Sequence, residues 1–137
     1  MGTVYAEITL KNVADEVKFR EGLIGEQDIR TLTVTSVVDT GAGSLVINEE
    51  LCQKLGLVIK EERNVGMADG RWVAAKLTEA VEVCWKDRQW PCAAIVIPGA
   101  KHVLLGAIPL EGMDLMVHPK TQELAGIHGD TAEFMAF

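Results

Sequence analysis

The chain is poor in basic residues, with 13 Lys and Arg against 20 Asp and Glu and a formal net charge of −7. Nucleic acids and anionic membrane surfaces attract proteins with clustered Lys and Arg. No apolar run approaches the roughly 20 residues needed to cross a bilayer. The first residues also lack the basic and apolar stretches of a secretion signal. We therefore expect a cytoplasmic protein that binds neither nucleic acid nor a membrane.

Cysteine is also scarce, with only Cys52, Cys84 and Cys92. An odd number without a secretion signal indicates reduced thiols. Cys84 and Cys92 flank an expected hairpin. A three-residue loop would make them face each other, whereas a two-residue loop would place them on opposite faces of the sheet. A disulfide between them therefore stays open. The three histidines share no ligand spacing with the cysteines, so we expect no metal site.

The rest of the composition suits one globular domain. The 137 residues are 48% hydrophobic and 24% charged, enough for a single domain with its own core over 1–137. Apolar and polar residues alternate over 4–11, and β-branched residues fill 30–38, which predicts two strands. Residues 12–27 are charged and contain two glycines, so we expect a loop there. The end of the chain, about 126–137, is expected to be a loose tail.

Turn and cap signals divide the remaining chain into short elements. Asn48 is a typical helix N-cap, and Gly56 follows the helix that it starts. Asp69-Gly70 between apolar strands predicts a hairpin, because glycine accepts the positive φ of such a turn. The pattern predicts an all-β domain with one or two short helices. The other expected elements are strands at 45–47, 77–85, 90–97, 115–117 and 123–125, and a short helix around 109–112.

One segment carries more information than any other: Val37-Val38-Asp39-Thr40-Gly41-Ala42, an apolar strand that leads an aspartate into a tight turn. A second apolar pair and glycine follow at Leu104-Leu105-Gly106. This order resembles the retropepsins, the retroviral-type aspartic proteases that work as homodimers, over residues 30 to about 125. Residues 106–111 are closest in pattern to prokaryotic single-domain members. The resemblance implies a retropepsin-like acid protease fold, closed by homodimerisation.

The resemblance also implies a role for each motif residue. Asp39 would be the catalytic residue, and two copies would bring two such carboxylates around one water, with no metal or cofactor. Gly41 would let the backbone fold tightly behind the acid. The Thr40 hydroxyl would hydrogen-bond across the two-fold axis, and Ala42 would leave room for substrate. The hairpin would be a flap over an extended peptide, formed by Met67, Ala68, Asp69 and Gly70, with Met67 either lining the cleft or belonging to the core.

Two departures from the family pattern keep another function open. Retropepsins usually carry an acid four residues after the catalytic aspartate and an arginine just after the second glycine, whereas here these positions are Gly43 and Ala107. Losing both partners together avoids the cost of about 3–5 kcal/mol that one unpaired buried charge would carry. The sequence predicts an aspartic endopeptidase that acts as a homodimer on peptide or protein substrates. The alternative is a non-catalytic dimeric peptide-binding or scaffold module, and Asp-Thr-Gly alone is also an ordinary strand-ending turn.

Overall fold

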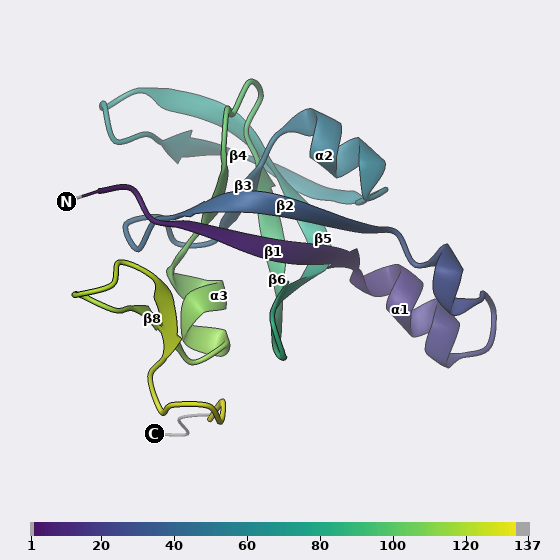
Figure 1. Ribbon diagram of the computed structural model, residues 1–137. Coiled ribbons are helices and arrows are strands. Elements are labelled where there is room, and N and C mark those ends of the chain that lie inside the picture. Colours follow the sequence, from purple (N-terminus) through teal and green to yellow (C-terminus); the bar gives the residue numbers. More distant parts are fainter. Residues whose placement is uncertain (1, 134–137) are drawn as a thin grey trace.

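The computed structural model describes residues 2–133 and consists mainly of β-strands (Figure 1). This confirms the all-β prediction. The strands are β1 (Tyr5–Asn12), β2 (Thr31–Val38), β3 (Leu45–Ile47), β4 (Ile59–Gly66), β5 (Trp72–Trp85), β6 (Arg88–Val96), β7 (Val103–Leu105), β8 (Leu115–Val117) and β9 (Leu124–Gly126). The helices are α1 (Val13–Arg20), α2 (Glu49–Lys54) and α3 (Ala107–Gly112), with a 3-10 turn η1 (Glu26–Asp28).

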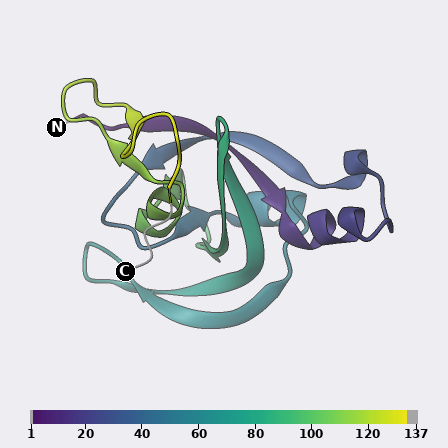
Figure 2. The same ribbon diagram turned by 90° about the horizontal axis from the view of Figure 1, so that it is seen from below.

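The main sheet closes on itself within one chain. Its strand order is β1-β2-β7-β3-β6-β5-β4, and β1 also pairs with β5, so the first six of these strands form a barrel and β4 extends from β5 (Figure 2). One chain therefore closes this sheet by itself, and homodimerisation stays a prediction.

Alternating side chains build the barrel core. In β1 the even-numbered residues Ala6, Ile8 and Leu10 are buried, whereas the odd-numbered ones point outward, as the pleat of a half-buried strand requires. Leu45 and Leu105 meet them in the same core and are fully buried. Each buried Leu or Ile side chain stabilises the fold by about 1.5–3 kcal/mol through the apolar surface it removes from water.

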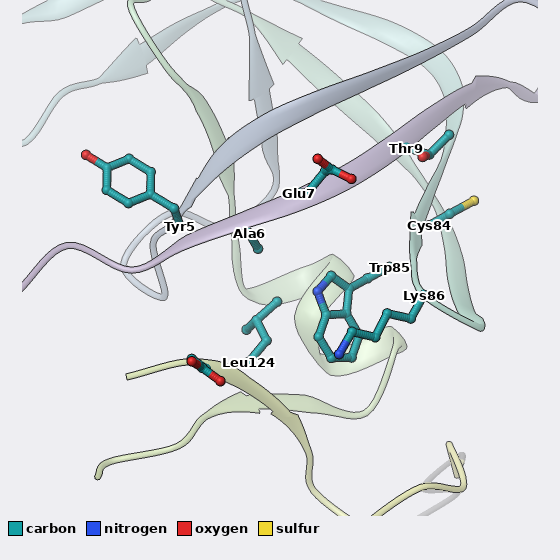
Figure 3. A pocket seen from close by; sticks show the side chains of 9 residues that line it. Tyr5, Ala6, Glu7, Thr9, Cys84, Trp85, Lys86 and Leu124 are labelled. Atoms are coloured by element: carbon teal, nitrogen blue, oxygen red, sulfur yellow. The ribbon is translucent and has the colours of Figure 1, made fainter. Parts of the chain in front are cut away.

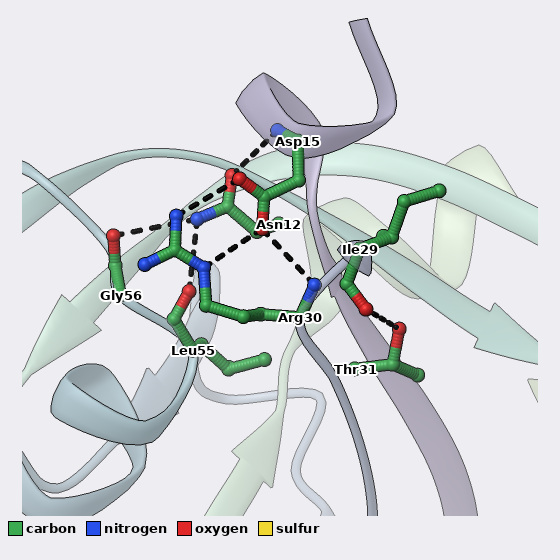
Figure 4. A network of polar contacts seen from close by, with 7 residues as sticks. All are labelled: Asn12, Asp15, Ile29, Arg30, Thr31, Leu55 and Gly56. Carbon is green, nitrogen blue, oxygen red and sulfur yellow. Dashed lines mark hydrogen bonds and ion pairs between the residues drawn. The ribbon is translucent and has the colours of Figure 1, made fainter. Parts of the chain in front are cut away.

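Helix α1 replaces half of the loop expected over 12–27. The Asn12 side chain caps α1 by accepting the Asp15 N–H at 3.1 Å, and Gly22 follows the helix with a φ of +78°. Asp15 is buried against Arg30, as Figure 4 shows, and this long-range pair fastens the helix to the start of β2. The described residues thus contain three α-helices and one 3-10 turn, where one or two helices were expected.

Part of the expected C-terminal tail is anchored. The Ile127 N–H donates to the Asp114 carbonyl at 2.8 Å, and the Arg88 guanidinium donates to the Gly129 carbonyl. The loose tail predicted from about residue 126 is therefore wrong for 127–130, whereas 134–137 lie outside the described residues. In Figures 1 and 2 the C-terminal β8–β9 hairpin and α1 lie at opposite ends of the molecule.

The cysteines are all unpaired thiols. A two-residue turn joins β5 to β6, and the register pairs Cys84 with Gln89 and Val81 with Cys92. Cys84 and Cys92 therefore lie on opposite faces of the sheet, which decides between the two alternatives, and all three cysteines are free. Burial raises the pKa of the Cys92 thiol to about 11. Such a thiol is inert near neutral pH.

Within residues 2–133 no helix is long and apolar enough to cross a bilayer. The same described residues contain no group of three or more His, Cys, Asp and Glu side chains arranged to hold a metal ion.

Candidate active site

Asp39 stands where the two apolar pairs of the sequence meet. Strand β2 runs parallel to β7, with Val37 opposite Leu104 and Val38 opposite Leu105. The Asp39 N–H then donates to the Leu105 carbonyl at 3.0 Å. The second motif therefore forms the wall on which the Asp39 loop is held, although residues 43–103 separate the two motifs in the chain.

The turn after β2 orients the Asp39 carboxylate. Its Oδ1 accepts the Gly41 N–H at 2.9 Å, and the Ala42 N–H donates to the Asp39 carbonyl at 3.1 Å. Asp39 is half-buried, whereas Thr40 and Gly41 are exposed. No hydrogen bond from the described residues reaches the second carboxylate oxygen, so that oxygen can accept from water or from another molecule.

Gly106 lies directly beneath this loop. A Cβ added there would come within 2.2 Å of the Ser44 carbonyl oxygen and 2.6 Å of the Ala42 carbonyl oxygen, so only glycine allows the approach. The start of α3 adds two bonds: the Ala107 N–H donates to the Ala42 carbonyl at 2.8 Å and the Ile108 N–H to the Gly43 carbonyl at 3.0 Å. The loop is thus held by backbone groups on both sides.

These same bonds bring together the two positions that depart from the family pattern. Gly43 and Ala107 lie next to each other, because the N–H of Ile108, the residue after Ala107, donates to the Gly43 carbonyl. An added Cβ at Gly43 would meet nothing within 4 Å. Backbone hydrogen bonds therefore link the segments at the positions where the resemblance to retropepsins would place an ion pair.

The β4–β5 connection forms the hairpin expected for a flap. The Met67 N–H donates to the Arg71 carbonyl at 2.7 Å, the Gly70 N–H donates to the Met67 carbonyl at 3.0 Å, and Gly70 has a φ of +89°. The tip residues Ala68, Asp69 and Gly70 are exposed. No hydrogen bond among the described residues links this tip to the Asp39 loop. A single β5 strand runs from the hairpin into the barrel, with a register shift between Leu77 and Ala80.

Arg71 is a contributor to the hairpin that the sequence analysis missed. Its backbone N–H and its Nε donate to the two oxygens of the Asp69 carboxylate at 3.0 and 2.6 Å, and these contacts lower the pKa of Asp69. The sequence Asp69-Gly70-Arg71 could have predicted this contact, because an aspartate side chain in an Asx turn accepts the N–H of the residue two positions later. Arg71 and Asp69 together stiffen the tip.

Met67 occupies a defined place under the hairpin. It is half-buried and packs against a small apolar cluster of Val46, Ala75 and Ile97, which is separate from the barrel core. Met67 therefore links the hairpin to the barrel wall through apolar contacts. Trp72, in contrast, is 74% exposed at the start of β5.

A family model described as "gag-polyprotein putative aspartyl protease" matches residues 26–112. The match contains the Asp39 loop, the hairpin and the second apolar motif. No curated protein matches the chain. The likeness of residues 106–111 to prokaryotic members stays a prediction. Because the matched stretch covers more than half of the chain and the strands form the expected barrel, the chain belongs to the retropepsin-like aspartyl protease family.

Proposed function

We propose that the protein is an aspartic endopeptidase that works as a homodimer, with Asp39 of each copy forming the catalytic pair. The observation that carries the proposal is the Asp39 loop: one oriented, half-buried carboxylate with an open second oxygen, flanked by exposed Thr40 and Gly41. The chain has one Asp-Thr-Gly, and this chemistry needs two carboxylates around one water. A two-fold dimer supplies the second one.

In the proposed reaction the two Asp39 carboxylates share a single proton, the behaviour that defines aspartic proteases as a class. The ionised carboxylate takes a proton from the bound water, which attacks the peptide carbonyl, while the protonated carboxyl donates to the carbonyl oxygen. The Gly41 N–H keeps one carboxylate oxygen in place throughout. The reaction uses no metal or cofactor.

The substrate in this proposal is an extended segment of a peptide or protein. The hairpin of Met67, Ala68, Asp69 and Gly70 closes over it and offers backbone hydrogen bonds, as strands do when they bind extended chains. A cavity of about 320 Å³ at the base of the hairpin, lined in part by Val65, Ala75 and Ile95, offers apolar surface nearby. We further propose that the enzyme works in the cytoplasm.

Gly43 and Ala107 favour a second candidate, a dimeric peptide-binding or scaffold module that does not cleave. Without the ion pair at these positions, a dimer relies on other contacts for its affinity. Asp39 is evidence against this candidate, since a protein that only binds peptides gains nothing from bringing two carboxylates together.

The test compares the wild-type protein with Asp39→Asn on an unstructured protein substrate at mildly acidic pH, with and without a pepstatin-type inhibitor. Asp39→Asn should abolish cleavage while the fold persists, because an amide cannot take the proton from water. Asp87→Asn, in the exposed β5–β6 turn, is the matched control and should retain activity.

Mixing provides the sharper measurement. Excess Asp39→Asn chain should capture wild-type chains in mixed dimers and silence them, and activity per chain should fall on dilution. If Asp39→Asn cleaves the substrate, or if an excess of this variant does not lower the activity of the wild-type protein, then two Asp39 residues do not form the catalytic pair. Tight peptide binding without cleavage by the wild-type protein would instead establish the scaffold function.

A further inference from the structure

A groove on the outside of the barrel is separate from the proposed active site. It has a volume of about 590 Å³ and lies between β1, the end of β5 and β9. Neither Asp39 nor any residue of 40–42 lines it. Figure 3 shows the side chains of Trp85, Lys86 and Leu124 in the space beside β1.

One wall of this groove is an open edge of β1. Antiparallel pairs alternate in their hydrogen bonding, and the Val38 N–H donates to the Val4 carbonyl at 2.8 Å, so the even-numbered backbone groups of β1 face β2. The odd-numbered groups point to the other edge. Strand β5 pairs with that edge from Thr9 onward. Among residues 2–133 no strand pairs there with Tyr5 or Glu7, so their N–H and C=O groups face the groove.

The side chains around the open edge have a definite character. Glu7 and Glu123 are exposed acids on opposite sides of the groove. The one basic residue in its lining is Lys86, whose Nζ lies 4.6 Å from the centre of its neighbour's ring, Trp85. The groove therefore combines an acidic rim, an indole and an aliphatic floor at Leu124.

We propose that this groove binds an extended, basic segment of a partner protein, which adds to β1 as an extra strand. Addition of a strand to a free sheet edge gains main-chain hydrogen bonds, and neighbouring hollows select the side chains. The open groups of Tyr5 and Glu7 supply the hydrogen bonds, the two glutamates select basic side chains, and Trp85 supplies contact area. Tyr5, which is 60% exposed, extends this surface at one end.

A different reason exists for a charged residue at a sheet edge, because charges there prevent unwanted pairing between chains. Glu7 alone would serve that purpose. Protection of this kind requires no hollow beside the edge and no indole lining it. The groove therefore distinguishes a binding edge from a merely protected one.

The test uses three synthetic hexapeptides with blocked ends: alternating Val and Lys, alternating Val and Glu, and the Val–Lys peptide with alternate amides methylated. Binding to the full chain is followed by backbone and indole NMR signals. The Val–Lys peptide should shift the signals of Tyr5, Glu7 and Trp85, and these shifts should not depend on those of 39–42. Amide methylation should weaken binding by about 2- to 10-fold for each hydrogen bond that it removes, since each lost hydrogen bond costs about 0.5–1.5 kcal/mol.

Two conservative variants locate the charge. Glu7→Gln and Glu123→Gln should each weaken binding of the Val–Lys peptide by about 2- to 5-fold, the range of an exposed ion pair. Glu50→Gln, on exposed α2, is the matched control and should leave affinity unchanged. The proposal is overturned if the Val–Glu peptide binds equally well, if the shifts map only to 39–42 or the hairpin, or if no binding occurs at millimolar peptide. It does not depend on the proposed activity, because binding is measured without cleavage.

Discussion

Asp15 and Arg30 form a two-point ion pair across the base of the β1–β2 connection. The Arg30 Nε and Nη2 each donate to one oxygen of the Asp15 carboxylate at 2.8 Å, and the Arg30 backbone N–H adds a third bond at 3.0 Å. The Asp15 side chain is 4% exposed and the Arg30 side chain 48% exposed. Figure 4 shows Asn12 joining the same network to the Leu55 and Gly56 carbonyls at the end of α2.

Asp15→Asn should therefore lower the free energy of unfolding by about 1–3 kcal/mol, because Arg30 loses a charged partner but keeps access to water. The Arg30 hydrogen bond lowers the pKa of Asp15. A lowered folded pKa gives stability that is present above the unfolded value of about 3.9 and is lost as pH falls through the folded value. Urea denaturation should show a large difference in the free energy of unfolding between the wild-type protein and Asp15→Asn near neutral pH. This difference should shrink as the pH falls below the unfolded pKa of Asp15, about 3.9.

Glu50→Gln is the control for Asp15→Asn, because the Glu50–Lys54 pair is exposed on both sides. It should change stability by less than about 0.5 kcal/mol. Equal losses in the two variants, or a loss in Asp15→Asn that persists at low pH, would contradict the structural role of the network.

Gly106→Ala should damage the proposed active site through packing alone. The new methyl group would meet the backbone of Ala42 and Ser44, which cannot rotate away, so the Asp39 loop must shift. We expect a loss of about 1–3 kcal/mol in stability and a fall in activity of at least about tenfold. Gly43→Ala, where an added Cβ meets nothing within 4 Å, should retain the stability of the wild-type protein. Thermal unfolding and peptidase assays of both variants decide the matter; similar behaviour of the pair would refute the packing argument.

Gly70→Val should raise KM or lower kcat of the proposed activity while the mass of the proposed dimer stays unchanged. Gly70 has a φ of +89° and open space around its Cβ position, so the cost comes from the backbone conformation, which β-branched residues resist. Gly22→Val is the matched control, because Gly22 also has a positive φ and open surroundings but follows α1. If both variants have the activity of the wild-type protein, the hairpin is not the flap.

His128→Gln should reveal a pH-dependent anchor of the C-terminal turn. The His128 Nδ1 lies 2.8 Å from the Asp114 carboxylate, which raises the pKa of His128. The sign follows from the raised value: the stabilisation is complete below the unfolded pKa of about 6.5 and is lost as pH rises through the folded pKa. The variant should thus unfold at a lower temperature than the wild-type protein in mild acid and at the same temperature in mild alkali.

Amide exchange gives a local readout of that anchor, because the Ile127 N–H donates to the Asp114 carbonyl. Its exchange should be faster in His128→Gln in mild acid only. A difference between the two proteins that does not vary with pH would show that the ion pair is not what holds the turn.

Much of the candidate site was predictable because its signals are local. Asn48 caps α2 by accepting the Leu51 N–H at 2.9 Å, Gly70 takes the positive φ of its turn, and the alternation in β1 matches its buried face. Each of these features depends on a few neighbouring residues. The local sequence alone therefore determined where the strands end, where the hairpin turns and which aspartate lies in the tight loop.

The features that sequence reasoning missed depend on partners far along the chain. Helix α1 has no apolar stripe from which it could be predicted. Asp15 is buried because Arg30, fifteen residues later in the chain, forms an ion pair with it. Arg88 holds the Gly129 carbonyl across 41 residues, which converts an expected tail into a packed turn. Such contacts join residues that are distant along the chain, so no local pattern contains them.

Tertiary structure alone also decided how the two motifs meet and which edge stays open. The parallel pairing of β2 with β7 places Leu105 against Asp39 and forces Gly106 under the loop. Strand β5 ends at Trp85, so the edge of β1 that faces away from β2 has no strand partner at Tyr5 and Glu7 among the described residues. Local chemistry sets the conformation of each segment, whereas its neighbours are set by the packing of the whole chain into one closed sheet.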